Sequence, residues 1–229
     1  MTPGLHIVNP GRVVEDPRIA RTLAYTVGVP PLFQDCRLDA FEPRRGTQRG
    51  LAAARRLADA PESDRGLVLS GPPGTGKTHL AVGVVASRIA AWLARWPAAV
   101  IDHPQGGVVV RPDMEDRFVV VPTLLDRLRA GIEYRGYDDP LPELVAARLL
   151  ILDDLGREKS TDWVLERLYV LVNERYNHRR PTIVTTNYTL NELVGRGYDA
   201  LVSRLAAGAD LVPLQAGDYR AEQARGARA

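Results

Sequence analysis

Gly71-Pro72-Pro73-Gly74-Thr75-Gly76-Lys77-Thr78 is the stretch that decides the fold of this 229-residue chain. It follows the short apolar segment 66–70 and precedes a helical pattern over residues 79–96. A glycine-rich loop that ends in Lys-Thr, between a strand and a helix, is typical of a phosphate-binding loop, or P-loop. The alternative is a chance turn rich in glycine and proline, and the flanking strand and helix argue against it.

The residue types of this loop predict a site for ATP and Mg²⁺. Its glycines allow the backbone to bend until the N–H groups converge on phosphate oxygens, and the following helix adds its positive N-terminal dipole. We expect Lys77 to reach the β- and γ-phosphates and the Thr78 hydroxyl to hold Mg²⁺. Lys77 is one of only two lysines among 30 basic residues, the other being Lys159. The residues expected to contact the nucleotide are Gly71, Pro72, Pro73, Gly74, Thr75, Gly76, Lys77, Thr78 and His79.

Two carboxylates follow an apolar run about seventy residues downstream. Leu149–Leu152 reads as a buried strand, and Asp153 and Asp154 stand at its end. We expect this strand to neighbour the one before the P-loop, so that Asp153 positions Mg²⁺ and Asp154 acts as general base toward the attacking water. Aspartate is shorter than glutamate, so turnover through Asp154 is expected to be slow. The alternative is a pair of aspartates that only caps a turn.

A polar residue also ends the apolar run Thr182–Thr186. Asn187 is a turn signal by itself, but beside a P-loop it is a candidate for orienting the attacking water near the γ-phosphate. Arg204 and Arg220, by contrast, read from the sequence alone as solvated surface charges.

Strands and helices alternate along the chain. This alternation, with strands that are apolar throughout, predicts an α/β fold with a parallel sheet covered by helices on both faces. The expected strands are 66–70, 117–121, 149–152 and 182–186, and the expected helices are 16–26, 47–60, 79–96, 123–134, 162–179 and 190–205. Thr123 with Asp126 reads as the cap of its helix. Residues 98–116 read as an insertion, with a hairpin that pairs 108–110 with a return around Pro112 and Asp113.

Composition excludes several classes of protein. The apolar runs stay below the roughly 18 residues that span a bilayer, and no secretory signal is visible, so we expect a cytoplasmic protein without a membrane partner. Cys36 is the single cysteine, which excludes an internal disulfide. The formal net charge of +2 does not by itself announce a nucleic-acid-binding protein.

These motifs together resemble a family. From about Val29 to Arg220 the chain looks like an AAA+ ATPase, and within that class like bacterial helicase loaders of the DnaC/DnaI type. The matching segments, in order, are VPPLF (29–33), GPPGTGKTHL (71–80), LILDDLG (150–156), ERLY (166–169), ERY (174–176), RPTIVTTN (180–187), VSRL (202–205) and DYR (218–220).

The resemblance implies roles that the residues alone do not. It places Asn187 at the sensor-1 position, Arg204 at the arginine-finger position acting on ATP held by a neighbouring subunit, and Arg220 at the sensor-2 position. It also implies an ATP-switched oligomer that loads the replicative helicase onto single-stranded DNA. Family loaders carry a separate helicase-binding domain, whereas here we expect residues 1–28 to be a short N-terminal extension with a possible partner-binding helix before an AAA+ domain at 29–229.

Single-stranded DNA binding requires basic groups for phosphates and aromatic faces for bases. Tyr134, Arg135 and Tyr137 supply both in one loop, and Lys159 with Trp163 forms a second candidate. Core packing is the alternative for Tyr134 and Trp163.

Three other functions stay open at this point. The first is a transposition ATPase of the related IstB type, which acts on duplex DNA and a transposase. The second is a P-loop kinase that transfers phosphate to a small molecule, and the third is an adaptor that binds ATP without turnover.

Overall fold

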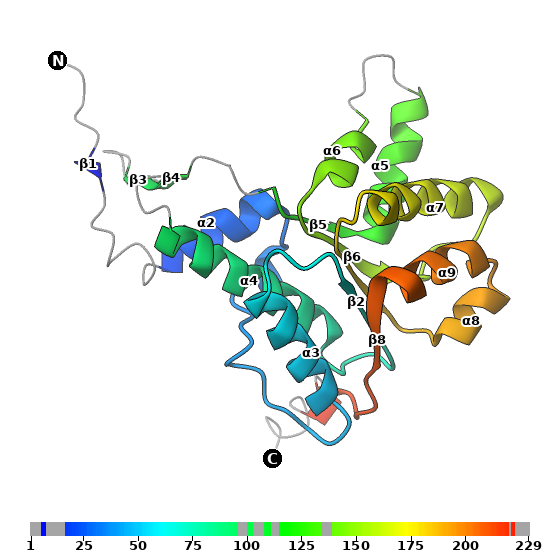
Figure 1. Ribbon diagram of the computed structural model, residues 1–229, viewed down its shortest axis with the longest axis horizontal. Helices are drawn as coiled ribbons and strands as arrows, with labels where there is room; N and C mark the ends of the chain where they lie inside the picture. Colours follow the sequence, from blue (N-terminus) through cyan, green and yellow to red (C-terminus); the bar gives the residue numbers. More distant parts are fainter. Residues whose placement is uncertain are drawn as a thin grey trace.

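A five-stranded parallel sheet forms the centre of the computed structural model (Figure 1). The structure describes residues 6–7, 17–95, 100–102, 108–110, 115–133, 139–219 and 221–222. The strand order is β5-β6-β7-β2-β8. The strands span β2 Gly66–Ser70, β5 Arg117–Val120, β6 Leu150–Leu155, β7 Thr182–Thr186 and β8 Ala209–Pro213. The prediction of an α/β fold around a parallel sheet is therefore confirmed.

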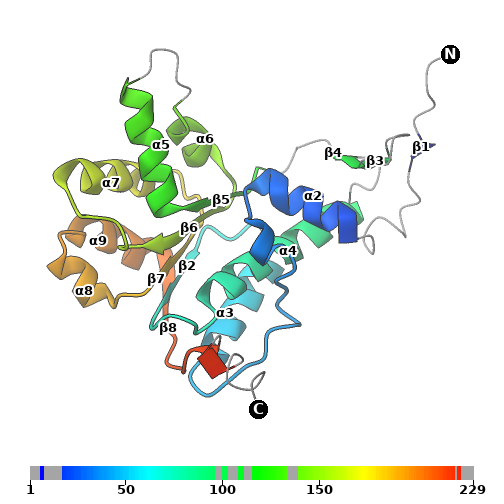
Figure 2. The same cartoon turned by 180° about the vertical axis from the view of Figure 1, so that it is seen from behind.

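Helices cover both faces of this sheet, as Figures 1 and 2 show from opposite sides. One face carries α2 Pro17–Val27, α3 Gln48–Asp59 and α4 Lys77–Arg95. The other carries α5 Val121–Glu133, α6 Leu141–Ala146, α7 Asp162–Asn177, α8 Leu190–Gly195 and α9 Asp199–Gly208. Successive side chains of a strand point to opposite faces, so Leu67 and Leu69 join the first core and Val68 the second.

The start of α5 differs from the expectation, and β4 has a pairing partner that the sequence does not indicate. The predicted cap at Thr123 is wrong, because α5 begins at Val121, directly after β5. Strand β4 (Val108–Val110) pairs antiparallel with β3 (Val100–Asp102), which precedes it. Strand β3 also pairs with β1 (His6–Ile7). The return point at Pro112 and Asp113 lies outside the described residues.

The helix expected near the N-terminus packs on the domain. The α2 side chains of Ala24 and Val27 are buried in the same core as α3 and α4, while Tyr25 on the same helix is 72% exposed. A short 3-10 helix, Pro31–Phe33, follows it. Within the described part of the chain, no helix has both the length and the apolar character needed to cross a membrane.

Two arginines fasten elements that the sequence leaves separate. Arg88 of α4 makes a buried bidentate ion pair with Asp116, just before β5, at 2.6 and 3.0 Å. Arg175 of α7 is fully buried and donates to carbonyl oxygens at the end of α6 and to the start of β7. These contacts connect helices on both faces to the sheet.

Candidate nucleotide-binding site

The carboxyl ends of three sheet strands converge on one site. β2 runs into the P-loop, β6 ends in Asp153 and Asp154, and β7 ends at Thr186 before Asn187. In the strand order, β7 lies between β2 and β6, so the expectation that the aspartate strand directly neighbours β2 is wrong. The gap is bridged by Thr185 of β7, whose hydroxyl contacts the aspartate pair.

The P-loop has a backbone that requires its glycines. Gly71, Gly74 and Gly76 all have positive φ, at 138°, 73° and 91°. A Cβ atom on Gly71 would lie 2.1 Å from the carbonyl oxygen of Leu214, and one on Gly76 would lie 2.5 Å from the ring of Phe41. Side chains at these positions would therefore displace the segments that pack around the loop.

Lys77 lies inside this loop. Its side chain is 7% exposed, and its ammonium donates to the carbonyl oxygens of Gly71 at 2.7 Å and Pro72 at 2.8 Å. The neighbouring Thr75 hydroxyl donates to the same Pro72 oxygen. The loop thus curls around the one cation that the sequence places in it, and two of its own carbonyl oxygens accept from that cation.

Thr78 and Asp153 meet, as the sequence predicted for two Mg²⁺ ligands. The Thr78 hydroxyl donates to Oδ1 of Asp153 at 2.9 Å, and the Thr185 hydroxyl donates to the same oxygen at 2.7 Å. Burial raises the pKa of the Asp153 carboxyl, and the adjacent Asp154 charge adds to this, while the two hydroxyls and Lys77 oppose it. Oxygen donors of this type suit Mg²⁺.

Asp154 is held in an unusual backbone conformation beside them. The β6–β7 pairing shifts register between Leu152 and Leu155, and Asp154 has a φ of 65°. Its N–H donates to the Thr185 hydroxyl, and its Oδ1 accepts from Asn187 Nδ2 at 3.1 Å. Its Oδ2 pairs with Arg157 at 3.1 Å. The bulge therefore turns the second carboxylate toward Asn187, whereas the first faces Thr78.

His79, in the first turn of α4, contacts the segment 37–41 that precedes α3. Its Nε2 donates to the carbonyl oxygen of Arg37 at 2.8 Å, and its ring meets Phe41 edge-on at a centroid distance of 5.3 Å. His79 thereby fastens residues 37–41 beside the P-loop helix.

The end of the described chain also reaches the loop. The Tyr219 N–H donates to the Gly74 carbonyl at 3.1 Å, and Arg44 donates to the Gly217 carbonyl and stacks on the Tyr219 ring. Arg220, predicted to contact the nucleotide, lies outside the described residues. Sequence reasoning missed Arg44 because its partners are about 170 residues away.

Arg204 does not join this site. It lines a hollow of about 440 Å³ at the amino-terminal ends of the strands, where β2, β7 and β8 begin, opposite the ends that carry the P-loop. The side chains that matter at this surface, called here the arginine hollow, are Arg65, Arg179, Arg180, Arg204, Asp64 and Tyr176. The five residues of strand β2, at about 3.3 Å per residue, separate the arginine hollow from the P-loop.

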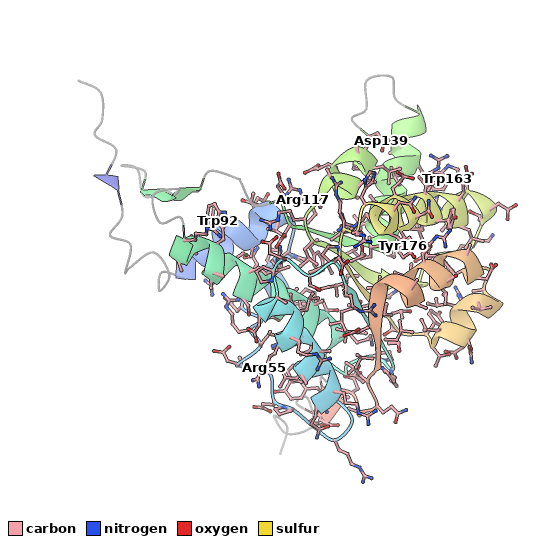
Figure 3. All side chains as sticks on the ribbon, viewed as in Figure 1. Arg55, Trp92, Arg117, Asp139, Trp163 and Tyr176 are labelled. Atoms are coloured by element: carbon pink, nitrogen blue, oxygen red, sulfur yellow. The ribbon has the colours of Figure 1, made fainter. Side chains whose placement is uncertain are left out.

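Two of the residues predicted to bind DNA, Lys159 and Trp163, lie away from this site. Lys159 is exposed after β6, and Trp163 at the start of α7 is partly buried against the core, with Arg129 over its ring at 5.3 Å. Figure 3 labels Trp163 on this helix. Tyr134, Arg135 and Tyr137 lie outside the described residues.

Thr185 and Arg157 are site residues that the sequence did not single out. Thr185 looked like part of an apolar strand, and only the position of its strand between β2 and β6 reveals its role. Its closeness to Asn187 in the sequence is the one signal that points to it.

Comparisons with known proteins find similar chains that include insertion-sequence proteins and helicase loaders. No family model matches. An insertion-sequence ATP-binding protein from Mycobacterium tuberculosis is 30% identical over 163 residues, which are 71% of this chain and 55% of that protein. The replicative helicase loader DnaC of Escherichia coli is 23% identical over 186 residues, which are 80% of this chain and 68% of that protein. The chain thus spans only about half the length of the first of these relatives.

A solved structure is similar over its whole length. The crystal structure of the DnaC helicase loader superposes with a TM-score of 0.63 at 26% sequence identity, and the match covers 81% of this chain and 100% of that one. The match therefore covers most of this chain.

Proposed function

Because this chain belongs to the DnaC/DnaI-type AAA+ helicase-loader family, which is related to ATP-binding proteins of insertion sequences, we propose that it loads a replicative DNA helicase onto single-stranded DNA. In this proposal ATP acts as the switch and lies between subunits of an oligomer. The observation that carries the proposal is the similarity to the DnaC structure over that structure's full length.

The site fits ATP and Mg²⁺ by its donor set. Lys77 already lies against oxygen acceptors within its own loop, and phosphate oxygens would replace the Gly71 and Pro72 carbonyls as its partners. Thr78 and Asp153 would hold Mg²⁺, which when bound would offset negative charge on the phosphates. The glycine backbone of the loop would supply the N–H groups.

Asp154 and Asn187 would activate and orient the attacking water. Asp154 would accept its proton, and Asn187 would keep the Asp154 carboxylate oriented through the 3.1 Å hydrogen bond. Arg157, which is 72% exposed, would exchange its ion pair with Asp154 for solvent at little cost.

Completion of the site would require a second subunit. Arg204 lies at the amino-terminal ends of the strands, whereas the P-loop of its own chain lies at their carboxyl ends. This separation supports a role of Arg204 toward ATP held by a neighbouring subunit. Arg220 is proposed to act on the nucleotide within its own subunit. Single-stranded DNA would contact Lys159 and Trp163, together with Tyr134, Arg135 and Tyr137.

A second candidate is a transposition ATPase that acts on duplex DNA. The observation that favours it is the 30% identity to the insertion-sequence protein, which exceeds the identity to DnaC of Escherichia coli. The two candidates share the ATP site and differ in the macromolecules they bind.

Co-purification distinguishes the candidates. The tagged chain would be co-expressed with the replicative helicase of the same organism and captured with and without ATP. We expect the helicase to be retained and the stoichiometry to depend on ATP, and we expect fluorescence anisotropy to show tighter binding to single-stranded than to duplex oligonucleotides.

Lys77→Ala is the matched control, because it removes the contact to the terminal phosphates. It should retain the helicase equally with and without ATP. A helicase that is never retained, combined with preference for duplex DNA, would overturn the loader proposal in favour of the transposition ATPase.

A further inference from the structure

Helices α7 and α9 pack side by side, and Arg204 lies between them. Figure 3 labels Tyr176 at this junction. Arg204 Nε donates to Oδ1 of Asn173 at 2.8 Å, and its guanidinium carbon lies 5.4 Å from the centroid of the Tyr176 ring. Both partners belong to α7, one helical turn apart. Helix α7 therefore holds the guanidinium of Arg204 in two ways: Asn173 accepts from its Nε, and the Tyr176 ring lies against its flat face.

This arrangement leaves the two terminal nitrogens of the guanidinium available. Among the described residues, Arg204 makes no hydrogen bond besides the one through Nε. The side chain is partly exposed and lines the arginine hollow. The terminal nitrogens form the planar pair that recognises phosphate in a bidentate way. Anchoring through Nε and stacking on a ring fix the plane of that pair without occupying it.

The surroundings favour an anion. The arginine hollow contains four arginines against the single carboxylate of Asp64. Arg179 pairs with Asp64 only at 3.7 Å with its side chain 83% exposed, and Arg65 pairs with Asp210 at the surface. The hollow thus keeps a net positive charge around the free end of Arg204.

We propose that Asn173 and Tyr176 are positioning residues for Arg204, which hold its guanidinium in the orientation that contacts ATP bound by the neighbouring subunit. This inference rests on the proposed role of Arg204 and adds the residues that prepare it. An arginine side chain whose orientation is fixed before the subunits assemble loses less conformational entropy when it contacts the ATP of the neighbouring subunit.

The test uses matched pairs of variants in the full chain, one that removes the contact to Arg204 and one that keeps it. Asn173→Leu removes the acceptor at similar volume, whereas Asn173→Asp keeps it. Tyr176→Ala removes the ring, whereas Tyr176→Phe keeps it. We expect Asn173→Leu and Tyr176→Ala to lower kcat for ATP hydrolysis by about 10- to 100-fold, a loss typical of a group misplaced by about 1 Å. Asn173→Asp and Tyr176→Phe should stay within about 3-fold of the wild type.

ATP affinity separates positioning from damage to the fold. Each variant keeps its own P-loop, so nucleotide titration should give wild-type affinity and light scattering should show normal ATP-dependent assembly. In an Arg204→Ala background, Asn173→Leu should lower kcat no further, because the group it positions is absent. An additional loss in that background would mean a structural effect and would overturn the inference.

The outcomes also separate this inference from the proposed function. If Arg204→Ala itself leaves turnover unchanged, the finger assignment fails. If Arg204→Ala lowers turnover while Asn173→Leu and Tyr176→Ala do not, the positioning role fails and the proposed function stands.

Discussion

At the scale of single residues, Asp153 is proposed to bind Mg²⁺, but its buried carboxylate lowers the stability of the folded protein at neutral pH. Desolvation raises the pKa of its carboxyl in the folded chain, so folding favours the protonated form. The stability that this preference contributes is fully present below the unfolded pKa of about 3.9 and is lost as the pH rises through the folded pKa. At neutral pH the charged carboxylate therefore destabilises the nucleotide-free protein. We predict that Asp153→Asn is more stable than the wild type in urea unfolding at pH 7 and that this difference shrinks toward pH 4, while Mg²⁺-dependent ATP hydrolysis is lost.

Asp153→Ala is the control for the two hydroxyl contacts. It removes the charge as well, but it leaves Thr78 and Thr185 without their shared acceptor, so it should be less stable than Asp153→Asn at both pH values. A wild-type protein that is more stable than Asp153→Asn by the same amount at pH 4 and pH 7 would contradict the desolvation argument.

At the scale of secondary-structure elements, Arg175 is the connection between α6, α7 and β7. Its guanidinium donates to the carbonyl oxygens of Leu144 at 2.8 Å, Ala147 at 2.7 Å and Pro181 at 2.6 Å. Burial lowers its pKa to about 9, which leaves it charged at neutral pH. We predict that Arg175→Met, which keeps much of the aliphatic volume, lowers the free energy of unfolding by about 3–5 kcal/mol, because several buried carbonyls lose their donor. Denaturant unfolding monitored by circular dichroism measures this.

Arg175→Lys should recover only part of the loss, because an ammonium has three donors and no planar fork. Arg180→Met is the matched control on the next segment, where the side chain is partly exposed and donates to a single carbonyl oxygen, that of Val145. A loss below about 1 kcal/mol for Arg175→Met would show that water replaces the lost donor.

At the scale of the whole molecule, the sheet separates the two halves of the proposed active site. The P-loop lies at the carboxyl ends of the strands and Arg204 at their amino ends. We predict that Arg204→Ala binds ATP normally but hydrolyses it poorly, since an arginine finger contributes about 10³–10⁵ in rate. Mixing it with Lys77→Ala should restore part of the activity, because Lys77→Ala subunits present an intact Arg204 to ATP held by their Arg204→Ala neighbours. The recovered rate should rise with total protein concentration.

The control mixes each variant with itself at the same concentration, and light scattering verifies co-assembly. Absence of recovery in mixtures that co-assemble would exclude action of Arg204 on a neighbouring subunit.

The sequence by itself determined the P-loop, the parallel sheet and the aspartate pair. These depend on local patterns: the strand before Gly71, the helix after Thr78, and apolar runs that end in polar residues. Strand β8 escaped prediction because it lies at the sheet edge, where only part of each strand is buried and Leu211 is 41% exposed. Helix α6 is six residues long, too short for a helical period to be recognised.

Only the tertiary structure decided which residues meet. Strand order is a long-range property, so it took the fold to place Thr185 between the P-loop and Asp153, to bring Arg44 to Tyr219, and to set Asn173 and Tyr176 against Arg204. The physical reason is that local sequence selects the conformation of a segment, whereas its partners are selected by burial of apolar faces that are far apart in the sequence.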